Sequence, residues 1–292
     1  MTFRYDLPDI DNAYALADWL EVMILRSRKP QIARAQLVDA FVAKLGSSSQ
    51  ELDVPVAMLF KEIARRRRIA GTGYPLWIDG SVIKFDHQSD CSFYVFLLLL
   101  SLDGPMRRER RFKEIDEIFD KVVCEAVEEY FGPGTSTLRF GWPPSDGRPN
   151  TFPVALDWLS TRIGVPVGSG MPAPATKDGG LDVVAWKPFE DHRSGFAMVL
   201  VQCTVQSDWF PKAADLLDDV WRGRLDMGRS PLTSLAVPFV IPKNFAKWDD
   251  LRRMVHLIFD RLRLAQMLAK RDPTSFAKMV SWNKKEISKF SI

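Results

Sequence analysis

The sequence predicts a mixed α/β protein with two domains: a mainly helical domain over residues 1–105, and a second domain over 106–292 in which a mixed sheet is flanked by helices. Three observations support this division. Apolar residues recur at helical spacing through most of the first 71 residues, a hairpin pattern follows at 74–85, and strand patterns alternate with helical ones after residue 181. With 292 residues, the chain is long enough for two ordinary domains.

The composition is that of a soluble globular protein with a substantial core. Apolar residues make up 46% of the chain and charged residues 26%, and the formal net charge is only +3. The three cysteines, Cys91, Cys124 and Cys203, have neither the spacing of a zinc site nor that of a disulfide framework, which favours a reduced, cytoplasmic protein. The longest apolar run, 93–102, is about half as long as a membrane span, so we expect a buried helix there and no membrane partner.

The first 85 residues predict three helices and a hairpin. Helical spacing covers 11–28, 31–46 and 55–71, and the hairpin turns at Asp79-Gly80. Three helices followed by a hairpin resemble a winged helix, whose third helix serves as the recognition element for DNA. On that hypothesis the third helix contacts phosphates through Arg65, Arg66, Arg67 and Arg68. A protein–protein module, or a basic helix face turned to solvent, fits the same run.

The rest of the chain predicts an alternation of helices and strands. A buried helix at 91–102 and a polar connection at 104–110 precede the second domain, and a loop rich in proline and glycine covers 165–180. The expected elements are a helix at 111–131, a strand at 135–142, a helix at 151–164, strands at 181–189 and 195–205, a helix at 208–223, a strand at 234–242 and a helix at 248–269.

Two polar residues, Asp182 and Gln202, lie within strand patterns that are otherwise apolar. A buried carboxylate or amide is costly unless it is paired or binds something. Because side chains alternate between the faces of a strand, adjacent strands can bring Asp182 and Gln202 together, and a carboxylate is a hard oxygen ligand for a divalent cation. Purely structural roles are the alternatives: Asp182 can cap a turn at "DGGLD", residues 178–182, and Gln202 can be a hydrogen-bonded core amide.

The segments "GGLDVVAW" at 179–186 and "VLVQC" at 199–203, after a helix that carries acidic residues, resemble the PD-(D/E)XK nuclease superfamily. They are most similar to its Mrr-type restriction endonuclease branch, in which Gln replaces the usual acid and Cys follows it. The resemblance covers roughly residues 111–242. It implies a restriction-endonuclease-like mixed sheet flanked by helices, and magnesium-dependent endonucleolytic hydrolysis of DNA in restriction or anti-phage defence.

The resemblance also implies roles for individual residues. Asp182 would be a catalytic metal ligand, and Gln202 would be the catalytic member on the second strand. The backbone carbonyl of Cys203 would also approach the magnesium ion. The acid from the preceding helix would be Asp120, which follows Phe119, with Glu125 as the second choice. DNA is the expected partner, and a homodimer or a subunit of a defence complex is the expected assembly.

The sequence departs from the family pattern at the catalytic lysine, because Thr204 occupies its position. Lys187 and Lys212 are the two candidates to replace it. We favour Lys212 as the catalytic cation, since the odd spacing of Lys187 from Asp182 places it on the opposite face unless a bulge intervenes. Two other functions stay open: a nuclease-like subunit that binds nucleic acid or protein without cleaving, and a winged-helix regulator with an unrelated C-terminal ligand-binding domain.

Overall fold

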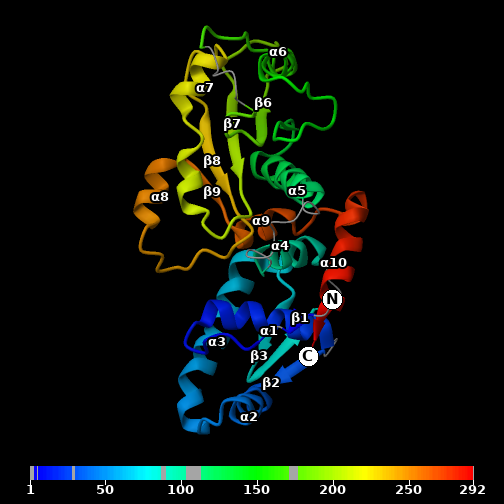
Figure 1. Cartoon of the computed structure of the whole chain (residues 1–292), viewed down its shortest axis with the longest axis vertical. Coiled ribbons are helices and arrows are strands. Elements are labelled where there is room, and N and C mark those ends of the chain that lie inside the picture. The colour runs from blue at the N-terminus through cyan, green and yellow to red at the C-terminus, as the bar shows by residue number, and fades with distance from the viewer. Residues whose placement is uncertain are drawn as a thin grey trace. The chain divides into compact units, whose positions relative to one another are not determined.

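The computed structural model describes residues 3–4, 6–27, 30–86, 90–102, 113–170 and 177–291, and it is a mixed α/β protein (Figure 1). The chain divides into two units: unit 1 consists of Met1–Leu102 together with Arg261–Ile292, and unit 2 of Asp103–Asp260. The predicted second domain ran to the last residue, whereas residues after 260 fall in unit 1. None of the described helices combines the length and the apolar character needed to cross a membrane.

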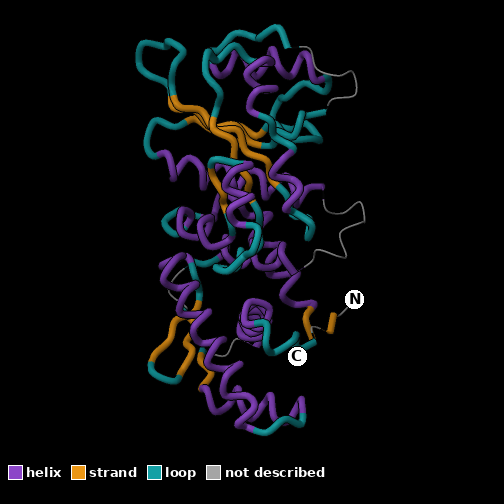
Figure 2. Tube along the Cα trace, turned by 90° about the vertical axis from the view of Figure 1, so that its left-hand side faces the viewer, coloured by secondary structure: helices purple, strands orange, loops and turns teal. Residues whose placement is uncertain are grey.

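Unit 1 is mainly helical, with two small sheets (Figure 2). Its helix α3 begins earlier than predicted because Ser48 and Glu51 form a capping box, in which each side chain accepts a hydrogen bond from the backbone N–H of the other residue. Its elements are β1 Phe3–Arg4, α1 Ala13–Ser27, β2 Gln31–Ala33, α2 Arg34–Leu45, α3 Ser49–Ala70, β3 Leu76–Asp79, β4 Val82–Phe85, α4 Ser92–Leu102, α9 Arg261–Leu268, α10 Ala277–Lys289 and β10 Phe290–Ser291.

The predicted hairpin is present in unit 1. Strands β3 and β4 pair in antiparallel fashion around Gly80, which has the positive φ of 58° that the turn requires. Strand β2, which the helical pattern at 31–46 had absorbed, adds to the far side of β4, so the sheet order is β2-β4-β3.

The interior of unit 1 holds a cluster of buried charges that joins α1, α3 and α9. The guanidinium of Arg66 bonds to Asp18, Glu21 and Glu62, and that of Arg261 bonds to Asp18 and to the Ser101 hydroxyl. Both arginines are fully buried. Burial opposes the charge on Asp18, but Arg261 and Arg66 outweigh it and lower its pKa. The residue that starts α9 is thus bonded to the N-terminal helices, which is why the end of the chain belongs to unit 1.

Unit 2 contains a five-stranded sheet in the order β5-β6-β7-β8-β9. Strand β6 is antiparallel to both neighbours, while β7, β8 and β9 are parallel. The elements are α5 Lys113–Phe131, β5 Ser136–Arg139, α6 Phe152–Ile163, β6 Val183–Lys187, β7 Ala197–Cys203, the 3₁₀ helix Phe210–Ala214, α7 Asp218–Arg224, β8 Leu232–Ala236, α8 Trp248–Met254 and β9 Leu257–Phe259.

Helices cover both faces of this sheet (Figure 1). On one face, Val184 and Leu200 pack with residues of α6 and with Trp221 of α7, and Leu235 packs with Leu251 of α8. Helix α5 packs on β5, β6 and β7, and strand residues of the opposite parity, such as Val201, are also buried. The middle of the sheet is therefore buried on both sides, and at its end Gln202 and Thr204 are buried while Asp182 is partly exposed.

Two predicted helices differ from the observed structure. The segment 208–223 splits into a 3₁₀ helix and α7, and its apolar residues serve two separate clusters: Ala213 packs near α8, whereas Leu216 packs near α6. The segment 248–269 is interrupted by β9, whose Leu-Ile-Phe sequence pairs with β8. A continuous apolar run has no period that separates a buried strand from a buried helix, so the pattern alone could not show this strand.

Candidate functional site

Asp182 and Gln202 meet at the end of the β6–β7 pair, as the alternation of side chains predicts. The Gln202 Nε2 donates to Asp182 Oδ2 at 2.9 Å, and the backbone N–H of Cys203 donates to the same oxygen at 2.7 Å. The Asp182 N–H in turn donates to the Val201 carbonyl, which continues the register of the two strands. The sequence-based prediction that these two side chains lie on adjacent strands and converge is confirmed.

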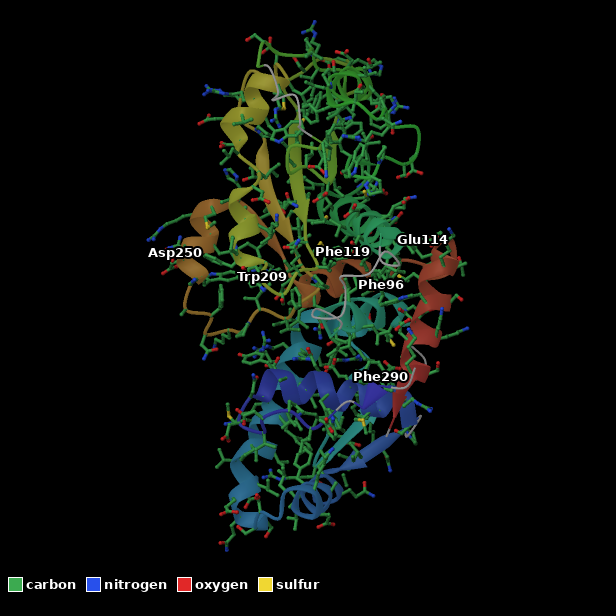
Figure 3. All side chains as sticks on the ribbon, in the orientation of Figure 1. Phe96, Glu114, Phe119, Trp209, Asp250 and Phe290 are labelled. Atoms are coloured by element: carbon green, nitrogen blue, oxygen red, sulfur yellow. The ribbon has the colours of Figure 1, made fainter. Side chains whose placement is uncertain are left out.

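Asp120 reaches the same place from helix α5. It follows Phe119, which is labelled in Figure 3, and it is 6% exposed. A Cβ built on Gly141 would lie 2.9 Å from Asp182 Oδ1 and 3.1 Å from Asp120 Oδ2, so both carboxylates border the space that this glycine leaves open. The N–H groups of Phe140 and Gly141 both donate to the Asp182 carbonyl, which fixes the glycine beside the two acids. Helix and sheet thus bring two carboxylates to one point.

Arg139, the last residue of β5, is part of this cluster and was not among the predicted site residues. Its Nε donates to Asp120 Oδ2 at 2.9 Å, and its Nη1 donates to the Pro143 carbonyl and the Ser145 hydroxyl. The side chain is only 4% exposed. An arginine inside the short strand pattern "STLRF" was the available signal, since a buried guanidinium needs an anionic partner.

Both carboxylates at this point are hard to ionise. Burial raises the pKa of Asp182 well above its usual range, and the negative charge of Asp120 raises it further. Burial also raises the pKa of Asp120, to about 7, although Arg139 works in the opposite direction. The thiol of Cys203 hydrogen-bonds to Asp120, and burial raises the pKa of that thiol, so it is not a ready nucleophile. Arg139 thus offsets only part of the free energy that ionising both acids would cost.

An unsatisfied oxygen lies next to the acids. The Gln202 Oε1 is buried and has no hydrogen-bond partner among the residues that the structure describes, and an added Cβ at Gly180 would lie 3.1 Å from it. Gly180 has a φ of 79°, and its lack of a side chain lets this loop approach the end of β7. A buried amide oxygen left without a donor is destabilising unless another group binds it.

The residues suit magnesium by their chemistry, though not as a cage of protein ligands. In the described part of the chain, no three His, Cys, Asp or Glu side chains form a group able to hold a metal ion. Magnesium, however, takes one or two carboxylates and keeps several waters. Asp182, Asp120 and the unsatisfied Gln202 oxygen provide hard oxygen donors of that kind, whereas the predicted Cys203 carbonyl accepts a hydrogen bond from Gln202 Nε2.

Neither predicted lysine is bonded to the acids. Lys212 Nζ pairs with Asp215 at 2.8 Å on a partly exposed surface, and Lys187 Nζ donates to the Phe131 carbonyl at the end of α5. Thr204, at the family's lysine position, is buried, and its hydroxyl accepts from the Gln206 N–H. The second-choice acid, Glu125, is partly exposed on α5. Among the described residues, the cation that bonds to these acids is Arg139.

Three of the four arginines predicted to bind DNA, at positions 65–68, make hydrogen bonds to other groups of the protein. Arg66 is fully buried among acids, so its assignment as a phosphate contact is wrong. Arg65 pairs with Glu62 through two nitrogens, and Arg67 donates to the Tyr74 carbonyl. Only Arg68 among the four is exposed. A run of four arginines on a helix must point in several directions, and the sequence did not show that one of them faces the core.

Comparison of the chain with protein-family models, with curated proteins and with solved structures found no match.

Proposed function

We propose that unit 2 is a magnesium-dependent nuclease of the PD-(D/E)XK type that hydrolyses phosphodiester bonds in DNA. The observation that carries the proposal is the meeting of Asp120, Asp182 and Gln202 at the end of the β6–β7 pair. A mixed sheet flanked by helices, which the sequence resemblance implies, supports the proposal: unit 2 runs α5, β5, α6, β6, β7, α7 and β8, with β5–β7 antiparallel and β8 parallel to β7.

Each residue has a distinct part in this proposal. Asp182 and Asp120 would bind the cation, which supplies charge neutralisation at the scissile phosphate and lowers the pKa of a water. The Gln202 amide holds Asp182 through Nε2, and its Oε1, which lies beside Gly180, is left to accept a hydrogen bond from a water of the hydrated cation. Because both acids have raised pKa values, a divalent cation would relieve the repulsion between them, and its binding would release protons.

Incubation of the full-length protein with supercoiled plasmid, linear duplex and single-stranded DNA, in magnesium or in EDTA, tests the function. We expect cleavage in magnesium alone. Magnesium at ten times its Kd should also stabilise the fold by about 1.4 kcal/mol, since it binds the folded site only. Thermal unfolding at pH 8 measures that effect independently of cleavage. A protein that neither cleaves any substrate nor responds to magnesium would contradict the proposal.

Gly141→Ala is expected to block the site without removing any of its functional groups. The added methyl would lie 2.9 Å from Asp182 Oδ1 and 3.1 Å from Asp120 Oδ2, in the space where we propose that the cation binds. We expect the magnesium-dependent shift in unfolding temperature to disappear and cleavage to fall at least about a hundredfold.

Gly223→Ala is the matched control, because the nearest atom to its added methyl is 3.8 Å away and the residue lies in helix α7. It should keep both the magnesium response and cleavage. If Gly141→Ala binds magnesium and cleaves like the unchanged protein, the cation does not bind beside this glycine.

A non-cleaving binding subunit is the second candidate. The observation in its favour is that Thr204 replaces the lysine while Lys187 and Lys212 are engaged elsewhere. Duplex binding in EDTA, together with a complete lack of cleavage in magnesium, would favour this candidate. In both cases we propose that unit 1 is a winged-helix module that contacts DNA or a partner protein; the support is the order α1, β2, α2, α3, β3, β4 with its antiparallel sheet.

A further inference from the structure

We propose that Arg139 binds the scissile phosphate and supplies the positive charge that a lysine at position 204 would otherwise provide. This inference rests on the proposed nuclease function. It assigns a substrate-binding and catalytic role to a residue on β5, outside the two strand motifs by which the site is recognised in the sequence.

The guanidinium of Arg139 is held with one edge directed into the site. Its Nε is bonded to Asp120, and its Nη1 is bonded to the Pro143 carbonyl and the Ser145 hydroxyl. Its Nη2 makes no hydrogen bond to any residue that the structure describes, and it lies 3.5 Å from the Cβ position of Gly141. That same position borders Asp182 Oδ1 and Asp120 Oδ2. Two nitrogens therefore fix the group, and the third faces the space between the acids.

This arrangement suits an anion that enters the site. A planar guanidinium can hold a carboxylate with one N–H while it donates another to a phosphate oxygen, and little side-chain freedom is lost because the group is already fixed. Charge grows on the phosphate oxygens as water attacks, so a donor placed there in advance favours the transition state. With Lys212 bonded to Asp215 and Lys187 bonded to Phe131, Arg139 is the cation that the described structure places among the acids.

A purely structural role is the competing explanation, since Arg139 also neutralises Asp120. The two roles differ in their response to substitution. If Arg139 only supports Asp120, then Asp120→Asn removes the need for it, and a further Arg139→Gln substitution should have no effect on DNA binding. If Arg139 contacts a phosphate, the further substitution should still weaken binding, because one counterion fewer is released.

The test uses full-length Arg139→Gln, Arg139→Lys, Asp120→Asn and the double variant Asp120→Asn with Arg139→Gln. The Kd for a duplex is measured in EDTA over a range of salt concentrations, and single-turnover cleavage is measured in magnesium. We expect Arg139→Gln to lower cleavage about a hundred- to a thousandfold. The double variant should show a salt slope smaller by about one than Asp120→Asn alone. Arg139→Lys should keep the slope and part of the cleavage.

Arg162→Gln, which removes an exposed arginine on α6, is the control and should leave folding and cleavage unchanged. If Arg139→Gln fails to fold, the double variant still decides, since it leaves no buried carboxylate without its partner. Equal salt slopes in the double variant and in Asp120→Asn would overturn the inference, and so would loss of cleavage in Lys212→Ala but not in Arg139→Gln. If the unchanged protein does not cleave at all, it is the nuclease function that fails.

Discussion

Asp182→Asn is expected to abolish magnesium-dependent cleavage and at the same time to stabilise the folded protein. Asparagine can accept the hydrogen bonds from Gln202 Nε2 and the Cys203 N–H at its Oδ1, and its Nδ2 can donate toward Asp120. The substitution replaces one of two neighbouring carboxyl groups with raised pKa values by a neutral side chain, so the repulsion between the two ionised acids is removed. We expect cleavage to fall at least about a hundredfold and the free energy of unfolding at pH 8 to rise by about 0.5–2 kcal/mol.

The direction of the pH effect follows from the raised pKa values. An acid whose pKa is higher in the folded than in the unfolded state contributes stability at low pH, and that stability is lost as the pH rises through the folded pKa. For Asp120 this loss begins near the unfolded pKa of about 4 and is nearly complete at the folded pKa of about 7, and the pKa of Asp182 is raised as well. The unchanged protein should therefore lose stability between about pH 4 and pH 8, and Asp182→Asn should lose less of it.

Urea unfolding at pH 5 and pH 8 measures the effect, with Asp157→Asn on the exposed face of α6 as a control that should match the unchanged protein. A variant that is inactive and also less stable at pH 8 would mean that Asp182 serves the fold rather than the chemistry. Residues of active sites often lower the stability of the fold in return for function. We expect Asp182 to be such a residue, so its substitution should raise the free energy of unfolding while cleavage is lost.

Arg66→Ala is expected to be the most destabilising single substitution in unit 1. Its guanidinium bonds to Asp18, Glu21 and Glu62, and removing it leaves these acids in the interior with only part of their compensation. Breaking a buried ion pair from one side costs about 3–5 kcal/mol. Burial already raises the pKa of Glu21 although Arg66 opposes it. Without the arginine, ionising this acid inside the protein would cost still more free energy.

Arg68→Ala is the control for that loss, because Arg68 lies two residues further along the same helix and is exposed. Its free energy of unfolding should stay within about 0.5 kcal/mol of the unchanged protein. Urea unfolding followed by circular dichroism compares the two variants. Equal stability of Arg66→Ala and Arg68→Ala would show that the buried cluster contributes nothing net to the fold.

The candidate site shows how far residue patterns reach. Asp182 and Gln202 could be paired from the sequence because alternation along two neighbouring strands is a local rule. Asp120 required a known motif as well, since nothing in a helical period says which acid turns toward a sheet. Arg139 could not be found in either way: it comes from a third strand, and its role depends on Gly141 and on the end of α5 lying beside it.

The fold shows the same limit. The β3–β4 hairpin was predictable because the Asp-Gly turn is a short-range signal, whereas β9 lies inside an apolar stretch whose period fits a helix equally well. Arg66 was misassigned for a related reason. A charged side chain such as that of Arg66 is predicted from the sequence to be exposed. It is buried because Asp18 and Glu21 of another helix, α1, lie within hydrogen-bonding distance of it.

Because unit 1 is made from two segments that lie on either side of residues 103–260, unit 2 is an insertion within it. A ribosome completes residues 103–260 before it makes Arg261, so the continuous unit can fold while the split one still lacks α9 and α10. Until then Asp18 has no Arg261 to bond with, and the faces of α3 and α4 on which α9 packs have nothing to cover them. A nascent or truncated chain that ends at Asp260 would therefore present the five-stranded sheet of unit 2 complete, tethered to a unit 1 that exposes apolar surface until α9 and α10 have been made.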